Sequence, residues 1–395
     1  MLAPYRRILT IPGALAFSMT GLVARFPISM TGLGMVLLVE ARTGSYGLAG
    51  AVSACAGVAG AVGSPVQGRL ADRVGQARVL LGAATVFATG LAVVLTAVET
   101  DRVVPLAFVG AVLAGGGLPQ AGAMVRTRWR HVAPDRPTMQ TGFAFEAVVD
   151  EVVFIVGPVV VVALATGVDP AVALVLAGGL GVVGAAVLSA QRATSPPVRL
   201  QSDVDARPRR PLGWTMLLPV VLASVGLGTV FGSTEVVTVA FTDDLGRPGA
   251  AGVLLAIWAA GSLVAGVLVG SVGSGWAPHR MFRIATLALG LSFVPMLFVA
   301  SVPLAALVLL ASGLAISPSL VASISLVERL VPSDRLTEGI GWATTGLAGG
   351  VALGAAASGA VVDAAGPNAA YAVPLAAGAL AAAMAWAIRP RVVAP

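Results

Sequence analysis

The sequence predicts an all-α membrane protein with twelve transmembrane helices arranged as two six-helix bundles. Hydrophobic residues make up 57% of the chain and charged residues only 11%, whereas soluble proteins carry about 25% charged residues. The mean hydropathy is +0.94. Apolar runs of about 20 residues, long enough to cross a hydrocarbon core of roughly 30 Å, recur along the chain between short polar loops.

Twelve of these runs predict the transmembrane helices. The expected ranges are 12–39, 46–67, 79–98, 103–125, 140–166, 171–190, 213–241, 249–272, 282–301, 303–327, 338–362 and 368–388. Arg6 and Arg7 precede the first run, but no small-residue cleavage site follows it. We therefore expect a retained helix and not a signal peptide.

The chain divides at a polar segment near its middle. Residues 191–212 contain four prolines and five arginines, a composition too polar for a span and unfavourable for a long helix. We therefore expect an N-terminal bundle over 1–190, a cytoplasmic linker over 191–212 and a C-terminal bundle over 213–395. Internal repetition supports this division, because VAPDR at 132–136 recurs as VPSDR at 331–335, each just before an expected helix.

The arginines indicate how the chain is oriented. The chain has no lysine, and twenty of its 24 arginines fall on the side that holds both termini, while only Arg42, Arg102 and Arg247 fall on the other. Positive residues concentrate in cytoplasmic loops, so we expect a multi-pass protein of the plasma (cytoplasmic) membrane with both termini in the cytoplasm. Because the arginines are scattered among short loops, we expect no nucleic-acid partner.

A charged run at 68–78, GRLADRVGQAR, separates the second and third apolar runs, and its glycines allow a tight reversal. The residues that match the pattern G-x-L-A-D-R-x-G are Gly68, Leu70, Ala71, Asp72, Arg73 and Gly75. The run therefore resembles the loop between helices 2 and 3 of major facilitator superfamily (MFS) transporters. The resemblance implies the MFS fold of two pseudo-symmetric bundles, transport by alternating access, and a monomer.

The same resemblance implies a gating role for the run. Asp72 would accept backbone N–H bonds at the start of the helix expected near Glu338, where the helix dipole favours an anion. Arg73 and Arg78 would brace the loop on either side of Gly75. The alternative is a basic loop that only fixes the orientation of the chain.

The helix expected over 140–166 contains Gly157-Pro158, a pair that can bend it by removing one backbone hydrogen bond. The pair resembles part of a longer glycine motif in drug:proton antiporters, the superfamily members closest in pattern to this chain. Two valines follow where that motif continues, and Ala111 stands near the place of the antiporters' mid-helix arginine. Arg25 would then supply the missing positive charge from the adjacent helix.

Charges within the apolar runs are few, and each is informative because a charge at the bilayer centre costs about 2.5–3.5 kcal/mol on insertion scales. Arg25 lies near the middle of the first run, and Glu146, Asp150 and Glu151 lie in the fifth. Glu146 and Asp150 share one helical face, and neighbouring carboxylates disfavour one another's ionisation. We hypothesise that Arg25 pairs with Asp150 or Glu151 and that protonation frees the arginine. The alternative is a permanent ion pair that locks the two helices together.

Glu235 lies in the seventh run and is the remaining embedded acid. Aligning the two halves places Phe231 at Phe26 and Glu235 at Met30, so Glu235 would join the substrate and proton path at a central cavity. The alternative is a hydrated position near the outer surface. The candidates for lining a mostly apolar cavity, each with ordinary packing as its alternative, are Phe26, Met30, Gln120, Phe231, Trp258 and Trp342.

No constellation typical of an enzyme or a metal site occurs in the sequence. Cys55 is the single cysteine, and His131 and His279 lie far apart without the spacing of metal ligands. The glycine runs lie inside apolar helices, where close helix packing explains them, and no P-loop is present. We therefore expect no metal, no cofactor and no direct use of ATP, with a proton gradient as the energy source.

The function that the sequence favours is secondary active transport, in which a proton gradient drives export of a small, moderately apolar molecule. The alternative is uptake of a small metabolite by symport or facilitation, for which Arg25 would suit an anionic substrate. A membrane-embedded enzyme or a non-transporting sensor is a more distant alternative, since neither clustered catalytic groups nor a sizeable soluble domain occur. The expected partners are the small-molecule substrate and the lipid bilayer.

Overall fold

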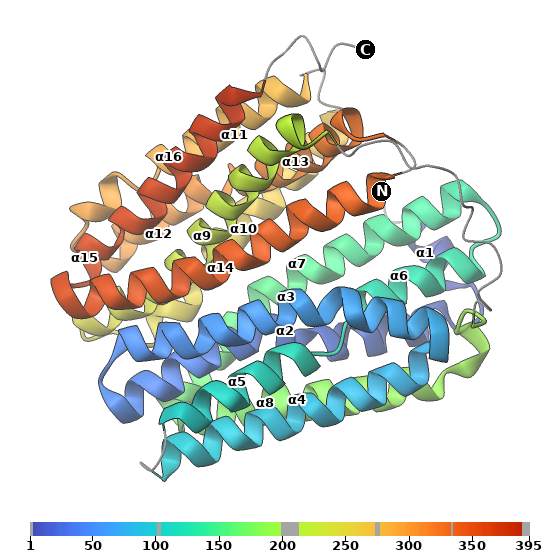
Figure 1. The fold of residues 1–395 in the computed structure, drawn as a ribbon, viewed down its shortest axis with the longest axis horizontal. Coiled ribbons are helices and arrows are strands. Elements are labelled where there is room, and N and C mark those ends of the chain that lie inside the picture. The colour runs from blue at the N-terminus through green and yellow to red at the C-terminus, as the bar shows by residue number, and fades with distance from the viewer. Residues whose placement is uncertain (1–2, 101–103, 199–212, 273–276, 333–334, 389–395) are drawn as a thin grey trace. The chain divides into compact units, whose positions relative to one another are not determined.

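The computed structural model describes residues 3–100, 104–198, 213–272, 277–332 and 335–388 (Figure 1). The α-helices are α1 (Ala3–Leu9), α2 (Ala14–Thr43), α3 (Tyr46–Val74), α4 (Gln76–Glu99), α5 (Val104–Gly117), α6 (Ala121–Val132), α7 (Arg136–Gly167), α8 (Pro170–Ala190), α9 (Trp214–Asp244), α10 (Ala250–Val272), α11 (Pro278–Leu291), α12 (Val302–Gly313), α13 (Ile316–Leu330), α14 (Leu336–Ala365), α15 (Pro367–Ala370) and α16 (Ala372–Ala387). Two 3₁₀ turns, η1 (Arg192–Thr194) and η2 (Pro295–Leu297), complete the set. The described residues contain no strand.

Twelve spans in the described ranges are long and apolar enough to cross a membrane, which confirms the predicted number and the all-α fold class. Several sequence-based expectations concern residues outside the described ranges. These are Arg102, most of the predicted linker (199–212) and the repeat positions Ser333 and Asp334.

Four expected helices are interrupted. The span expected over 103–125 is α5 followed by α6, and the one over 303–327 is α12 followed by α13. The helix expected over 282–301 ends at Leu291 and continues as η2, and the helix over 368–388 is split by Tyr371 into α15 and α16. The spans exist as predicted, but none of these four is a continuous helix.

Prolines explain the interruptions. Three glycines followed by Leu118-Pro119 separate α5 from α6, and glycine has low helix propensity while proline disfavours helical geometry in the residue before it. Pro318 and Pro374 lie in the first turns of α13 and α16. Since proline has no N–H to bond the carbonyl four residues earlier, each helix begins anew just before its proline.

The run at 68–78 is more helical than expected. α3 continues through Gly68 and Asp72 to Val74, because arginine, leucine and alanine are strong helix formers. The reversal is made by Gly75 alone, whose φ of 92° lies in the region that favours glycine, and α4 begins at the next residue. Gly75 is therefore the turn residue, and Gly68 is not part of the reversal.

Aspartate caps begin two of the helices. The Asp135 carboxylate accepts a hydrogen bond from the Thr138 N–H at 2.7 Å, and Asp169 accepts one from the Ala171 N–H at 2.8 Å. Both caps precede a proline at the start of the helix, a combination typical of helix N-termini. Hydrogen bonds from the side chain and backbone of Thr138 hold the pKa of Asp135 below its usual value.

The described residues group into two compact units. The first contains Met1–Met35 and Val58–Asp205, and the second contains Val36–Gly57 and Ala206–Pro395. The end of α2 and the beginning of α3 thus group with the C-terminal helices. The division into bundles at 191–212 stays a prediction.

Close backbone contacts organise each unit. In the first, α4 packs along α5 and α8, and a Cβ on Gly90 would come within 2.2 Å of the Ala114 nitrogen. In the second, α9 and α14 run side by side (Figure 1). A Cβ on Gly228 or Gly232 of α9, or on Gly350 of α14, would come within about 2 Å of a carbonyl oxygen of the facing helix. Helix packing, as expected, accounts for these glycines.

In the second unit, the end of α14 holds the beginning of α3. The Asp363 carboxylate accepts hydrogen bonds from the Ser45 hydroxyl at 2.8 Å, the Tyr46 N–H at 2.9 Å and the Gly47 N–H at 2.8 Å. Asp363 thereby satisfies two N–H groups of the first helical turn that have no partner within α3. One turn further on, a Cβ on Gly50 would lie 2.2 Å from the Ala355 oxygen, so the two helices are in backbone contact.

We predict that Gly350→Ala lowers the free energy of unfolding by about 1–3 kcal/mol, the usual cost of overpacking. The added methyl would meet the Val225 carbonyl, 2.0 Å away, and the thermal unfolding midpoint of the purified protein measures the loss. The matched control is Gly349→Ala, since a Cβ on Gly349 meets nothing within 4 Å. The control should unfold at the original temperature or slightly above it, and equal midpoints for the two variants would contradict the packing argument.

We further predict that Asp363→Ala loosens the first turn of α3 by about 1 kcal/mol, the typical cost of losing a helix cap. Amide hydrogen exchange over residues 45–50 should become faster, while exchange in the middle of α3 stays unchanged. Asp363→Asn keeps an acceptor and should retain part of the protection. Exchange in Asp363→Ala that equals that of the unmodified protein would show that the cap does not stabilise this turn.

Candidate functional site

Arg25 lies in the middle of α2 and is almost completely buried, with 5% of its side chain exposed. Its Nε donates a hydrogen bond to the Gly21 carbonyl at 3.0 Å. A Cβ on Gly21 would come within 3.1 Å of Arg25 Nη2, and one on Gly122 within 3.3 Å of Arg25 Cδ. The two glycines therefore leave the room that the arginine occupies between α2 and α6.

Glu146 of α7 is the main partner of Arg25, and no part of its side chain is exposed. Its Oε2 accepts a hydrogen bond from Arg25 Nη2 in an ion pair. Its Oε1 accepts hydrogen bonds from the Ser18 hydroxyl at 2.7 Å and from Trp129 Nε1 at 2.8 Å. Both carboxylate oxygens thus have partners, which is the condition under which an ionised group tolerates burial.

Asp150 lies one turn beyond Glu146 and is shared by two arginines. Its Oδ1 accepts a hydrogen bond from Arg25 Nη1 at 2.8 Å, and its Oδ2 accepts one from Arg126 Nη2 at 2.6 Å. About a third of the side chain is exposed in both of these residues, 32% for Asp150 and 36% for Arg126. Of the two carboxylates that hold Arg25, Asp150 is therefore the more exposed.

Glu151 is the third acid of α7 and is half-buried. No side chain or backbone group in the described ranges forms an ion pair or hydrogen bond with its carboxylate. When all five groups are ionised, Arg25 and Arg126 balance Glu146 and Asp150, and Glu151 adds one uncompensated negative charge. A proton is the simplest way to remove that charge.

The structure brings together part of the constellation expected from the sequence. Arg25 pairs with Asp150, one of its two expected partners, but its second partner is Glu146 and not Glu151. Sequence reasoning missed Ser18, Arg126 and Trp129. Arg126 was counted among the loop arginines because the fourth span was expected to end at residue 125, whereas α6 continues to Val132.

The signal that could have located α6 is its spacing. Arg126 and Trp129 are three residues apart, which places both on one face of a helix. Gly142, one turn before Glu146, marks the place where the Trp129 indole lies against α7, since a Cβ there would be 2.6 Å from the ring. Phe17 of α2 packs on the same indole edge-to-face, with ring centroids 5.0 Å apart.

Arg128 of α6 has a structural role and is completely buried. Its guanidinium donates hydrogen bonds to the carbonyls of Leu188 and Gln191 at the end of α8, at 2.8 and 2.9 Å, and to Gln76 Oε1 at 3.0 Å. A cation at a helix C-terminus binds the carbonyls left without partners there. Arg128 thus joins α4, α6 and α8.

The break between α5 and α6 is held by Gln67 of α3. Its Nε2 donates hydrogen bonds to the carbonyls of Gly116 and Leu118, both at 3.0 Å, and its Oε1 accepts one from the Gln120 N–H at 3.2 Å. Gln120, a cavity-lining candidate, accepts a hydrogen bond from the Ser64 hydroxyl at 3.0 Å. The amide of Gln120 therefore takes part in the network that stabilises the interrupted helix.

In the second unit, Glu235 is half-buried within α9, and its carboxylate has no ion pair or hydrogen bond among the described residues. Phe231, one turn earlier, contacts Trp258 of α10 with ring centroids 5.5 Å apart at 64°. The Trp258 indole N–H donates to the Ser312 hydroxyl of α12 at 3.2 Å. The two aromatic candidates of this unit thus lie together, beside the turn that carries Glu235.

The remaining cavity candidates have different surroundings. Met30 is 1% exposed and packs near Gly157 of α7, which is an ordinary packing position, whereas Phe26 is half-buried. Trp342 is exposed and contacts Trp214, with ring centroids 5.1 Å apart.

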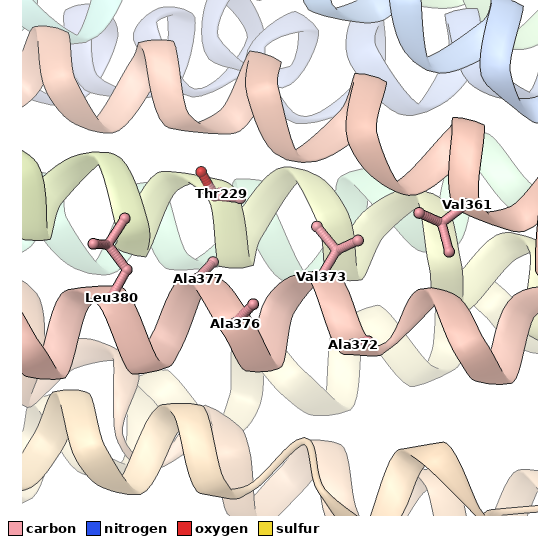
Figure 2. A pocket seen from close by; sticks show the side chains of 7 residues that line it. All are labelled: Thr229, Val361, Ala372, Val373, Ala376, Ala377 and Leu380. Atoms are coloured by element: carbon pink, nitrogen blue, oxygen red, sulfur yellow. The ribbon is translucent and has the colours of Figure 1, made fainter.

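Figure 2 shows an apolar pocket in the second unit, between α9, α14 and α16. Its volume is about 410 Å³, and its lining residues are Thr229, Val361, Ala372, Val373, Ala376, Ala377 and Leu380. Thr229 is the only polar residue among them, and its hydroxyl donates to the Val225 carbonyl of its own helix. The pocket therefore offers no charge and contains none of the candidate residues.

The 68–78 run ends α3 and begins α4 with its charged side chains outward. Asp72, Arg73 and Arg78 are exposed. At the start of α14, Glu338 forms an ion pair with Arg335 at 2.7 Å. The contact expected between Asp72 and this helix would join the two units, and it stays a prediction.

A comparison with family models decides the kind of protein. The model described as Major Facilitator Superfamily matches residues 17–246 and 220–395. The chain belongs to the Major Facilitator Superfamily. This result confirms the resemblance drawn from the 68–78 run, and the chain is a multi-pass membrane transporter of the MFS type and not an enzyme.

Solved structures of MFS transporters share the fold. The nucleoside transporter NupG is 15% identical with a TM-score of 0.74, and the match covers 95% of this chain and 98% of that one. A peptide transporter of the POT type is 15% identical with a TM-score of 0.72, covering 97% and 95%. A POT family transporter in complex with 5-aminolevulinic acid is 13% identical with a TM-score of 0.71, covering 97% of each chain. A comparison with curated proteins finds no match.

We predict that Glu146→Gln destabilises this MFS transporter by about 3–5 kcal/mol, the range for removing one partner of a buried ion pair. The amide would leave the Arg25 charge without its buried counter-ion and would turn an N–H₂ group towards hydrogen-bond donors. The thermal unfolding midpoint in detergent measures the effect.

Glu151→Gln is the matched control on the same helix, because the Glu151 carboxylate has no partner among the described residues. It should change the free energy of unfolding by no more than about 0.5 kcal/mol. A Glu146→Gln variant as stable as this control would mean that Glu146 does not anchor the cluster.

Proposed function

We propose that the protein is a secondary active transporter in which an inward proton gradient drives export of a small, moderately apolar molecule by alternating access. Membership of the Major Facilitator Superfamily supports transport itself. The single observation that carries proton coupling is the position of Asp150, a partly exposed carboxylate shared by Arg25 and Arg126.

The proposed coupling step is protonation of this carboxylate. Neutral Asp150 binds the two arginines less strongly than the anion does, because the charge-assisted hydrogen bonds become neutral ones. Arg25 stays in place, since the buried Glu146 still holds its Nη2. Arg126 loses the one ion-pair partner that it has among the described residues, so the proton releases α6 from α7 at this point. The half-buried Glu151, one residue further, is the second carboxylate available to the proton.

This assignment changes the role first expected for Arg25. The sequence suggested that protonation would free Arg25 for an anionic group, whereas under this proposal Arg25 would stay paired with Glu146 when Asp150 is protonated. Arg126 is the more exposed arginine and becomes the mobile cation of the cluster. The alternative function, uptake of an anionic metabolite, would therefore place the substrate on Arg126.

The remaining features of the proposal follow from the sequence. The arginine distribution supports insertion in the cytoplasmic membrane with both termini in the cytoplasm. A proton gradient would serve as the energy source without a cofactor or metal, and the protein would act as a monomer with no nucleic-acid partner. Asp72, Arg73 and Arg78 would form a cytoplasmic latch with the start of α14 that opens when the bundles move.

Transport into proteoliposomes tests the coupling. A compound panel would be screened with and without an imposed proton gradient. We predict that Asp150→Asn reduces gradient-driven accumulation of a transported compound at least tenfold and removes its pH dependence, while exchange of the same compound in the absence of a gradient continues. Glu151→Gln should shift the pH dependence without stopping transport.

Asp244→Asn is the control, because Asp244 is an exposed acid at the end of α9. Accumulation of the compound by this variant, and the pH profile of that accumulation, should equal those of the unmodified protein. Normal gradient-driven transport with unchanged pH dependence in both Asp150→Asn and Glu151→Gln would refute the coupling role. Accumulation that requires an inward proton gradient, so that the proton and the compound move in the same direction, or that involves anions only, would favour the uptake alternative.

A further inference from the structure

We propose that Glu235, with Phe231 and Trp258, recognises a positively charged group on the transported molecule, so that the substrate is an organic cation with an apolar body. The inference rests on the proposed transport function and adds the chemical class of the substrate. It is carried by an embedded carboxylate that lacks a counter-ion and lies beside an aromatic pair.

The first step is the location of Glu235 within its helix. It lies nine residues before Asp244, the last residue of α9, which is roughly 13 Å along the helix axis at 1.5 Å per residue. This distance places the carboxylate inside the span and away from either end of a helix of 31 residues. A charge at such a depth is costly unless another charge compensates it.

The second step is the absence of a compensating charge beside Glu235 on the helices that share the most contacts with α9. These helices are α14, α16, α15, α10 and α13. Of these, α10, α15 and α16 contain no ionisable residue. The charged residues of α13 and α14 lie at the helix ends: Glu328, Arg329, Glu338 and Asp363. None of the described residues forms an ion pair with Glu235.

The arginines embedded in the first unit are already bound to other groups of that unit. Arg25 binds Glu146 and Asp150, Arg126 binds Asp150, and Arg128 binds the carbonyls at the end of α8. Each guanidinium has partners within its own unit, so none is left over as a counter-ion for Glu235. None of the described residues pairs with Glu235, so we take the cation that neutralises it to be a proton or a bound molecule.

The third step is the aromatic pair, which favours a molecule over a proton alone. Phe231 lies one turn before Glu235 on the same face of α9, and its ring contacts Trp258 edge-to-face. Ser312 fixes the Trp258 indole through its N–H, so the orientation of the ring is set by the protein. The faces of aromatic rings attract organic cations, and their apolar area binds hydrocarbon groups.

The hydroxyl groups on the same stretch of α9 do not compete for the carboxylate. Thr234 donates to the Val230 carbonyl at 2.7 Å, and Thr238 lies 3.3 Å from the Tyr371 hydroxyl. A neutral polar substrate would therefore meet one carboxylate and two rings, whereas a cation would gain both the ion pair and the cation–π contact. An anionic substrate would be repelled.

Equilibrium binding to the purified full-length protein tests the proposal. The probe is radiolabelled tetraphenylphosphonium, whose charge does not depend on pH, and the neutral comparator is triphenylphosphine oxide, which has similar aromatic groups. The unmodified protein should bind the cation at least tenfold more tightly than the comparator. Glu235→Gln should lower the affinity for the cation at least tenfold and leave that for the comparator within twofold.

Two further variants keep the test decisive if Glu235→Gln folds poorly. Glu235→Asp retains the charge and should keep most of the preference for the cation, while Phe231→Leu retains apolar volume and should lower the affinity for the cation two- to fivefold. Asp244→Asn, at the end of the same helix, should bind like the unmodified protein. No preference for the cation in the unmodified protein, or equal affinity in Glu235→Gln, would overturn the proposal.

Binding at equilibrium needs no proton gradient, so the outcome is separate from that of the coupling experiment. If Asp150→Asn transports normally but Glu235→Gln binds the cation at least tenfold more weakly, proton coupling through Asp150 is wrong and the recognition site stands. If Asp150→Asn loses coupling while Glu235→Gln binds the cation unchanged, the transport function stands and the substrate class is wrong.

Discussion

The structure depends on one constraint, that a charge or a backbone polar group inside a membrane is costly unless another group or a proton compensates it. The ion pair between Arg25 and Glu146 is the clearest example of a buried charge compensated by another. Glu146 is completely buried and receives hydrogen bonds from Ser18, Arg25 and Trp129, so α2, α6 and α7 are fixed to one another at a single carboxylate. This anchor determines where Asp150 and Arg126 lie, and hence where a proton can act.

The same constraint explains the interrupted helices. The α5–α6 break and the ends of α8 and α16 leave backbone groups without helical partners, and a polar side chain from another helix binds them. Gln67 binds the backbone at the α5–α6 break, and Arg128 binds the end of α8. Arg283 of α11 likewise donates to the carbonyls of Ala385 and Ile388 at the end of α16, at 3.2 and 2.7 Å. Residues that looked like loop or packing residues are therefore needed where the backbone is irregular.

These contacts show what the sequence could predict. Hydropathy was sufficient for the number of spans, because length and composition decide whether a helix crosses a bilayer. The pattern at 68–78 was sufficient to identify the superfamily. One of its matching residues, Gly75, makes the turn in a conformation that few residues other than glycine adopt. The choice of Glu146 over Glu151 as the partner of Arg25 was not predictable, since it depends on how α2 and α7 are rotated against each other. Arg126 was missed because the fourth span was expected to end at residue 125, so the residues that continue α6 to Val132 were assigned to a loop.

The embedded charges also bear on how much energy the membrane potential can supply to the proposed transport cycle. In the first unit Arg25 and Arg126 balance Glu146 and Asp150, and ionised Glu151 adds one negative charge that a bound proton would neutralise. In the proposed exporter, a monovalent cation bound at Glu235 would travel in the direction opposite to the proton. Exchange of one proton for one such cation moves no net charge, and the membrane potential, worth about 2.3 kcal/mol per charge at 100 mV, does no work on it. With Glu151 as a second proton carrier, two protons would enter for each cation, and the potential would add to the pH gradient. Under the proposed coupling, the number of acids in α7 that carry a proton would set how steep a substrate gradient the transporter can sustain.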